Sequence, residues 1–241
     1  MASRGGVFRL SILVLAACAA GMAGTVVGWY NGDPVDQFTV GLTNGIDTGG
    51  YPAANVYEDF IVPAGGWTVA GVFAYDFLDF APGTQAEWAI RSGMSSGNGG
   101  TLIASGTDTA TYTSTGESGA GSTIYKVEVD NLSVALAPGK YWLTLAPVDC
   151  GSGCDSAVDD TIGTNAIGNP PGNDLDNFDN FPAVGLNYVF DPTSGGSARD
   201  WSLGVLIQTG LPTPEPGALS LFAAGLFAAG LLKKRSLRPH R

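Results

Sequence analysis

Short stretches of alternating hydrophobic and polar residues fill the middle of the chain. In Thr84–Arg91, Trp88 and Ile90 fall on one side of the alternation, whereas Glu87 and Arg91 fall on the other. Alternation of this kind is typical of a β-strand with one buried face. Glycine, asparagine, aspartate and proline separate the stretches, and no amphipathic helix of convincing length lies among them. The pattern predicts an all-β fold, namely a β-sandwich of about nine or ten strands.

The predicted strands are Thr25–Tyr30, Gln37–Leu42, Tyr57–Val62, Trp67–Tyr75, Thr84–Arg91, Thr101–Ser105, Thr123–Asp130, Lys140–Ala146, Val184–Phe190 and Asp200–Gln208. The acidic stretch Pro147–Pro182 is predicted to be a loop, and the polar Thr/Ser/Gly segment that ends at Ser122 is not assigned to a strand. In the fourth strand, alternation places four side chains on one face: Trp67, Val69, Phe73 and Tyr75.

The segment from residue 212 to residue 241 differs from the rest of the chain. Pro214, Glu215 and Pro216 break any regular element, and the Ala218–Leu232 run that follows carries no charge over 15 residues. A membrane-spanning helix usually needs about 20 apolar residues, so this run is short for a permanent span. The residues expected to form the membrane anchor are Ala218, Leu221, Phe222, Leu226, Phe227, Leu231 and Leu232. The basic residues expected to remain on the cytoplasmic side are Lys233, Lys234 and Arg235.

The tripeptide, the short apolar helix and the basic end together resemble the PEP-CTERM sorting signal of Gram-negative bacteria. The resemblance implies that Pro214–Pro216 is recognised by an exosortase, a membrane transpeptidase-like protease that removes the tail. The body would be anchored transiently to the inner membrane on its periplasmic side, and would then pass to the cell surface or extracellular matrix. A plain C-terminal tail anchor is the alternative. Tyr57–Gln208, with its strings VPAGGWTV and LAPGKYWLTLAP, is similar to the bodies of other PEP-CTERM proteins, which implies a jelly-roll-like sandwich.

The N-terminus carries a matching export signal. Arg4 and Arg9 precede an apolar stretch, Leu10–Ala20, and small residues follow it. This is the pattern of a secretory signal peptide, a substrate of signal peptidase. Cys18 lies in a string that resembles a lipoprotein lipobox, so lipidation is the alternative. The chain thus divides into a signal peptide (1–23), a β-sandwich domain (24–211) and a sorting segment (212–241).

The body is strongly acidic. All 22 acidic residues lie in Gly24–Glu215, where only Arg91, Lys126, Lys140 and Arg199 are basic. Four basic residues against 22 acidic ones leave a formal charge of −18 on this part of the chain. Such a charge repels DNA and anionic lipid, so no nucleic-acid partner is expected.

Side chains for catalysis are scarce in the body. The single histidine, His240, lies in the tail, which excludes a Ser-His-Asp or Cys-His nucleophile and a histidine-based zinc site from the body. Nothing singles out two carboxylates as a glycosidase pair, so no enzymatic activity is expected. Cys150 and Cys154 bracket Gly-Ser-Gly, and oxidation after export predicts a disulfide that closes this loop.

Oxygen ligands for a cation gather in the acidic loop. Asp174, Asp176, Asn177 and Asp179 are close together in the chain, and calcium prefers six to eight hard oxygen ligands. The segment departs from the EF-hand pattern. A calcium site is therefore one prediction, and a solvated acidic loop is the other.

One tryptophan is a candidate for an exposed ring. Trp88 and Trp201 share faces with aliphatic residues and are expected in the core, whereas Trp142 shares its face with Lys140 and Thr144. An exposed indole could stack on a sugar. The sequence therefore predicts an exported, non-enzymatic surface or matrix protein with a structural or adhesive role. The alternative is a carbohydrate-binding module for exopolysaccharide, with Trp142 at its site.

Overall fold

The computed structural model describes residues 24–35, 41–46, 53–79, 81–119, 122–148, 156–170, 174–190 and 200–209. All of them belong to one compact unit, Gly24–Thr209. The predicted signal peptide and the predicted sorting segment lie outside the described residues.

The described residues form fourteen strands and one short 3-10 helix, η1 (Pro182–Val184). The strands are β1 (Thr25–Tyr30), β2 (Gly41–Thr43), β3 (Asn55–Val62), β4 (Trp67–Leu78), β5 (Gln85–Ser92), β6 (Thr101–Gly119), β7 (Ser122–Val129), β8 (Val134–Leu136), β9 (Gly139–Val148), β10 (Ser156–Thr161), β11 (Asn177–Phe181), β12 (Leu186–Phe190), β13 (Asp200–Trp201) and β14 (Leu203–Gln208). The prediction of an all-β fold is confirmed, and the strands outnumber the nine or ten expected. No described residue belongs to an α-helix, and none lies in a helix long and apolar enough to cross a membrane.

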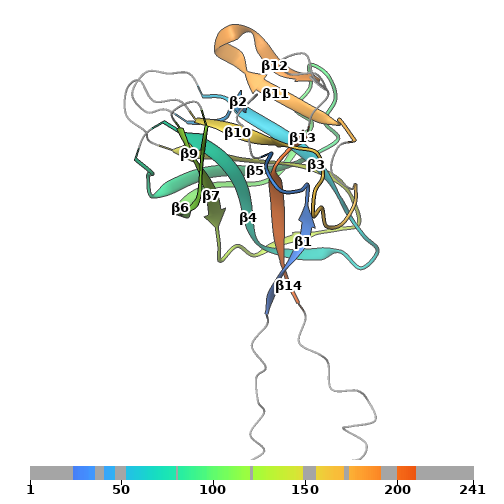
Figure 1. The fold of residues 1–241 in the computed structure, drawn as a ribbon. Coiled ribbons are helices and arrows are strands. Elements are labelled where there is room, and N and C mark those ends of the chain that lie inside the picture. The colour runs from blue at the N-terminus through green and yellow to red at the C-terminus, as the bar shows by residue number, and fades with distance from the viewer. Residues whose placement is uncertain are drawn as a thin grey trace, which may run out of the picture. The chain divides into compact units, whose positions relative to one another are not determined.

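Strand β6 joins two halves of the sheet. The main strand order is β1-β14-β4-β7-β6-β5-β9-β3-β11-β12, and β2, β8, β10 and β13 lie off this path (Figure 1). The first part of β6, through Thr109, pairs with β5, and the part from Ala110 onward pairs with β7. Both pairings are antiparallel, as are the other named strand pairs. We call one side of β6 the β4 half; it consists of β1, β14, β4 and β7. We call the other side the β9 half; it consists of β5, β9, β3, β11 and β12.

The core lies between these halves, because both contribute apolar side chains to one buried cluster. From the β9 half come Val56, Phe60, Val62, Ala86, Trp88, Ile90, Tyr141, Leu143 and Leu145. From the β4 half come Trp29, Val69, Val72, Ala74, Val127, Val129, Leu203 and Val205. Trp88 and Trp201 are in this cluster, as predicted. The two-faced arrangement is compatible with a sandwich of two layers.

The face predicted for β4 is wrong beyond its first three residues. Val69 packs in the core, as expected, but Phe73 lies in a separate cluster with Tyr75 packed against it. The cause is a β-bulge, because Ala70 is an extra residue in the pairing of β4 with β14. An extra residue moves every later side chain to the opposite face.

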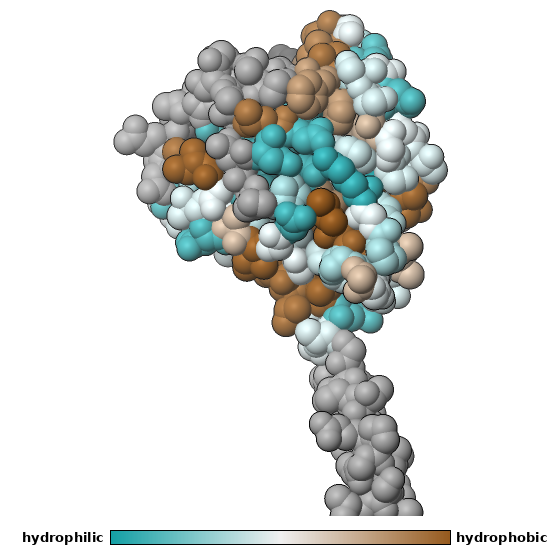
Figure 2. All heavy atoms as spheres, turned by 90° about the vertical axis from the view of Figure 1, so that its right-hand side faces the viewer, coloured by the Kyte–Doolittle hydropathy of each residue, from teal (hydrophilic) through white to brown (hydrophobic). Residues whose placement is uncertain are grey.

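The surface carries no continuous apolar area on the face shown in Figure 2, where hydrophilic residues form a central patch and hydrophobic ones are scattered around it. The large exposed hydrophobic side chains come from several elements, with two of them on β6: Val26, Leu102, Ile103, Ile162, Ile167, Val184 and Phe190. Scattered exposure of this kind is ordinary for a folded protein.

Candidate functional site

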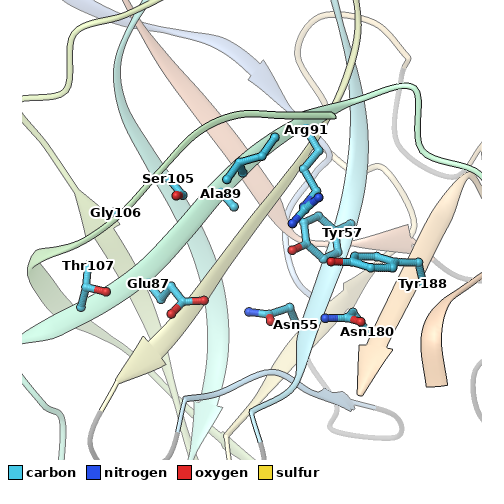
Figure 3. A pocket seen from close by; sticks show the side chains of 11 residues that line it. Asn55, Tyr57, Glu87, Ala89, Arg91, Ser105, Gly106, Thr107, Asn180 and Tyr188 are labelled. Atoms are coloured by element: carbon cyan, nitrogen blue, oxygen red, sulfur yellow. The ribbon is translucent and has the colours of Figure 1, made fainter. Parts of the chain in front are cut away.

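A polar pocket of about 330 Å³ lies on the outer face of the β9 half, on the side away from the core. Five strands contribute to it: β3, β5, β6, β11 and β12. Its lining residues are Asn55, Tyr57, Glu87, Ala89, Arg91, Leu102, Ser105, Gly106, Thr107, Asn180 and Tyr188 (Figure 3). We call this the outer-face pocket.

The alternation of β5 orients the charged side chains of the pocket. Trp88 and Ile90 point into the core, so Glu87 and Arg91 must point outward, as the sequence predicted. Strand β9 pairs with β5 on one side and with β3 on the other. This pairing brings Tyr57 of β3 to the same outer face, where its ring lies 5.8 Å from the Arg91 guanidinium carbon.

Arg91 is held in place by a backbone carbonyl oxygen and two aromatic rings. Its Nη1 donates a hydrogen bond of 2.9 Å to the carbonyl oxygen of Gly99, and its guanidinium carbon also lies 5.2 Å from the ring centre of Tyr188. Its buried Nε has no hydrogen-bond partner among the described residues. Figure 3 shows the guanidinium pointing toward the two tyrosine rings. The side chain is therefore fixed in orientation while donors remain unused.

Tyr188 has an unusual backbone conformation. Its φ is 51°, which costs an aromatic residue on the order of 1–2 kcal/mol. Its carbonyl oxygen accepts a hydrogen bond of 2.9 Å from the Gly97 amide. A Cβ on Gly99 would lie 2.5 Å from the Tyr188 ring, so only glycine permits this approach. The surrounding chain thus holds Tyr188 over the pocket in spite of local strain.

Two polar side chains face each other at the other end of the pocket. Burial raises the pKa of Glu87, and the Asn55 amide acts in the opposite direction. Asn55 is only 8 % exposed, and its Nδ2 forms no hydrogen bond with any described residue. Figure 3 shows the ends of both side chains directed into the same space. A buried donor without a partner is unfavourable unless a ligand or water satisfies it.

The prediction that Trp142 is exposed is wrong. Its side chain is 6 % exposed and packs with Tyr57, Ala89, Met94 and Phe178. Phe178 of β11 covers it, with ring centres 6.2 Å apart and an edge-to-face geometry. The face was predicted correctly, but β11 adds a layer of side chains over it. The burial removes the reason for predicting sugar contact at Trp142.

The residues predicted as calcium ligands lie in different surroundings. Asp174 is exposed and Asp176 pairs with Lys140, whereas Asn177 and Asp179 are buried on β11. Among the described residues, no group of three or more acidic, histidine or cysteine side chains is placed to hold a metal ion. The solvated-loop alternative is wrong for β11, because two of its polar residues are buried. The calcium site remains a prediction.

Several predicted sites lie outside the described residues. These are the sorting motif Pro214–Pro216, the anchor Ala218–Leu232, the basic residues Lys233–Arg235 and the cysteines Cys150 and Cys154. The sorting signal and the disulfide remain predictions.

The sequence analysis placed Glu87 and Arg91 on an outward face but did not recognise a site there. Asn55, Asn180 and Tyr188 come from strands distant in the chain, and only the strand pairing brings them together. The available signal was the pair of opposite charges on one face of β5.

Comparison with protein families and with curated proteins gives no relative. No family model matches the chain, and a search of curated proteins finds no match. The geometry of the outer-face pocket is therefore the basis for any functional proposal.

Proposed function

We propose that this chain is an exported, non-enzymatic surface or matrix protein whose body binds a saccharide in the outer-face pocket. The body would be a jelly-roll-like β-sandwich, with the pocket on the outside of one sheet. The observation that carries the proposal is Arg91 Nε, which has no hydrogen-bond partner among the described residues, in a pocket flanked by two tyrosines.

A saccharide matches the chemistry of the pocket. Its hydroxyl groups can accept from Asn55 and Arg91 and donate to Glu87, which would satisfy the polar atoms that lack partners. Tyrosine rings provide an apolar face with a polar end, and both Tyr57 and Tyr188 line the space. The volume of about 330 Å³ is at the small end of the range of about 300–1,000 Å³ for ligand pockets.

The pocket favours binding over hydrolysis. Retaining and inverting glycosidases use two carboxyl groups on either side of the scissile bond. Among the described residues that line the pocket, Glu87 is the only acid. A binding role therefore fits the side chains that are present better than glycoside hydrolysis does.

Tyr188→Ala is expected to weaken saccharide binding by about tenfold or more, because truncating a central aromatic residue typically costs over 1 kcal/mol. The measurement is binding of the full-length protein, in mild detergent, to an array of bacterial and plant oligosaccharides. Ile162→Ala is the control, since Ile162 is 70 % exposed and does not line the pocket. Failure of the wild-type protein to bind any saccharide would refute the proposed function.

Export and sorting rest on the two terminal signals. Signal peptidase and an exosortase would be the processing partners, and the inner membrane would hold the precursor. The intact mass of the protein from the envelope and medium of its native host is expected to lack residues 1–23 and the segment beyond Pro214–Gly217. Recovery of Ala218–Arg241 on the mature protein would instead indicate a permanent tail anchor, and a lipid-sized addition to Cys18 would indicate a lipoprotein.

A further inference from the structure

We propose that the saccharide carries a carboxylate, as uronic acids do, and that this group binds to the Arg91 guanidinium. The inference rests on the proposed function, because it specifies the class of ligand for the same pocket. It is carried by the pairing of charges in the body and by the way in which Arg91 is held.

The basic residues of the body are few, and Arg91 differs from Lys126 and Lys140 in its partners. Lys126 forms an ion pair with Glu128. Lys140 Nζ lies 3.0 Å from a carboxylate oxygen of Asp59 and forms a second ion pair with Asp176. Arg91 forms no ion pair with any described residue. In a body with so many acids, a pocket cation that forms no ion pair with a described residue points to a ligand that supplies a carboxylate.

The geometry of Arg91 suits a planar anion. A guanidinium presents parallel N–H groups that match the two oxygens of a carboxylate. One N–H is occupied by the Gly99 carbonyl oxygen, and the rings of Tyr57 and Tyr188 flank the group. These contacts fix its plane before a ligand arrives, which reduces the entropy lost on binding. The buried Nε has no hydrogen-bond partner among the described residues.

The opposite end of the pocket sets the direction of the ligand. Glu87 lies four residues before Arg91 on the same face of β5, about 13 Å away at the usual rise per residue. A carboxylate would be repelled near Glu87 and attracted near Arg91. Sugar hydroxyls can instead donate to Glu87 and accept from Asn55. The pocket therefore has an anion-binding end and a hydroxyl-binding end.

The net charge of the body makes this recognition local. At −18, the region between Gly24 and Glu215 repels anions at long range. The rings of Tyr57 and Tyr188 shield the Arg91 guanidinium from solvent. Salt therefore screens its attraction for a carboxylate less than it screens the long-range repulsion. Saccharides with isolated carboxylates should therefore bind better than densely charged polyanions.

The test uses matched acidic and neutral ligands. The full-length protein in mild detergent is titrated calorimetrically with glycosides of galacturonate, glucuronate and mannuronate that carry one carboxylate each, and with the methyl ester of each. The wild-type protein is expected to bind at least one acid roughly 10- to 100-fold more tightly than its ester, the range of a charge-assisted bidentate interaction. Arg91→Gln is expected to abolish this preference, with a loss of affinity for the acid that is larger than the loss for the ester.

Two further variants separate charge from structure. Arg91→Lys keeps the charge but loses the bidentate geometry, so it should retain only part of the preference. Glu87→Gln removes the like charge and is expected to strengthen binding of the acid more than that of the ester. Lys126→Gln, on a different face, is the control and should change neither affinity.

The outcomes distinguish the two proposals. Equal binding of acids and esters, unaffected by Arg91→Gln, would overturn the inference and leave saccharide binding intact. Binding of neutral saccharides alone would have the same meaning. Competition by acetate at the same carboxylate concentration would show capture of any anion and overturn the assignment to a saccharide. Absence of binding to acids, esters and neutral sugars alike would overturn both proposals.

Discussion

Replacing Phe60 with alanine is expected to lower the free energy of unfolding by about 3–5 kcal/mol. Phe60 lies on β3 and is fully buried in the core cluster. Its ring centre lies 5.5 Å from that of Trp29 and 5.7 Å from that of Tyr141. A third ring, that of Trp67, stacks on it at 6.2 Å. The surrounding rings are large and rigid, so they cannot collapse into the space that the substitution leaves.

The measurement is urea unfolding of the wild-type and variant proteins, followed by tryptophan fluorescence. Ile162→Ala is the matched control, because Ile162 is 70 % exposed and should change stability by no more than about 0.5 kcal/mol. A loss below about 1 kcal/mol in Phe60→Ala would contradict a close-packed aromatic core. Tyr57 of the outer-face pocket lies on the same strand as Phe60, β3, and is held in place only in the folded protein. The variant should therefore also weaken saccharide binding in proportion to the fraction of protein that is unfolded.

Hydrophobic alternation identified the strands that face the core. It placed Trp88 and Ile90 opposite Glu87 and Arg91, and β5 has this arrangement. It did not identify the second part of β6, because Thr111–Glu117 is exposed except for Tyr112 and contains no apolar face. Backbone pairing with β7 holds that segment in the sheet, and side-chain patterns carry no information on such pairing.

The prediction that Pro147–Pro182 is a loop is wrong for β10 and β11, because polar side chains of these strands are buried. Strand β10 includes Asp159 and Asp160, and both are fully buried. Strand β11 buries Asn177 and Asp179 in the same way. A pattern that equates polar residues with solvent must assign these segments to loops. The sequence analysis did not predict β11, and this omission also explains the error at Trp142, because Phe178 of that strand covers the indole.

The candidate site could be predicted only in part. The charges of Glu87 and Arg91 on one strand face were readable from the sequence, as was the scarcity of basic residues. The contribution of Tyr188 was not, because it depends on a left-handed backbone conformation and on the close approach of Gly99. Both features arise from long-range strand pairing, which no local pattern encodes.

A buried carboxyl group on β4 is expected to make the protein less stable as the pH rises. Asp76 is fully buried, and burial raises its pKa to about 8. Asn44 Nδ2 donates to Asp76 Oδ1 at 3.1 Å and to the Leu145 carbonyl oxygen at 2.7 Å. Asp76 Oδ2 accepts no hydrogen bond from the described residues. The Asn44 amide is therefore the one donor to Asp76 among the described residues, and it carries no charge. An ionised Asp76 would be an unpaired charge in the core.

The sign follows from the protons bound in each state. The unfolded chain loses the Asp76 proton near the ordinary value of about 3.9, whereas the folded protein retains it until about pH 8. Between these values the folded state binds more protons, so the free energy of unfolding falls with rising pH by at most about 1.4 kcal/mol per unit. Above the folded pKa both states are ionised, and this contribution to the slope ends.

Asp76→Asn should remove most of this dependence, because the amide is isosteric and does not titrate. From pH 5 to pH 8, the stability of the variant relative to wild type is expected to rise by up to about 4 kcal/mol. Burial also raises the pKa of Asp59, to about 7, with Lys140 acting in the opposite direction, so a residual slope of the same sign should remain. Urea unfolding at pH 5, 6.5 and 8 measures the difference, with Glu117→Gln as the exposed control. Parallel pH profiles for wild type and Asp76→Asn would mean that Asp76 is ionised in the folded protein, with a cation or solvent reaching it in the core.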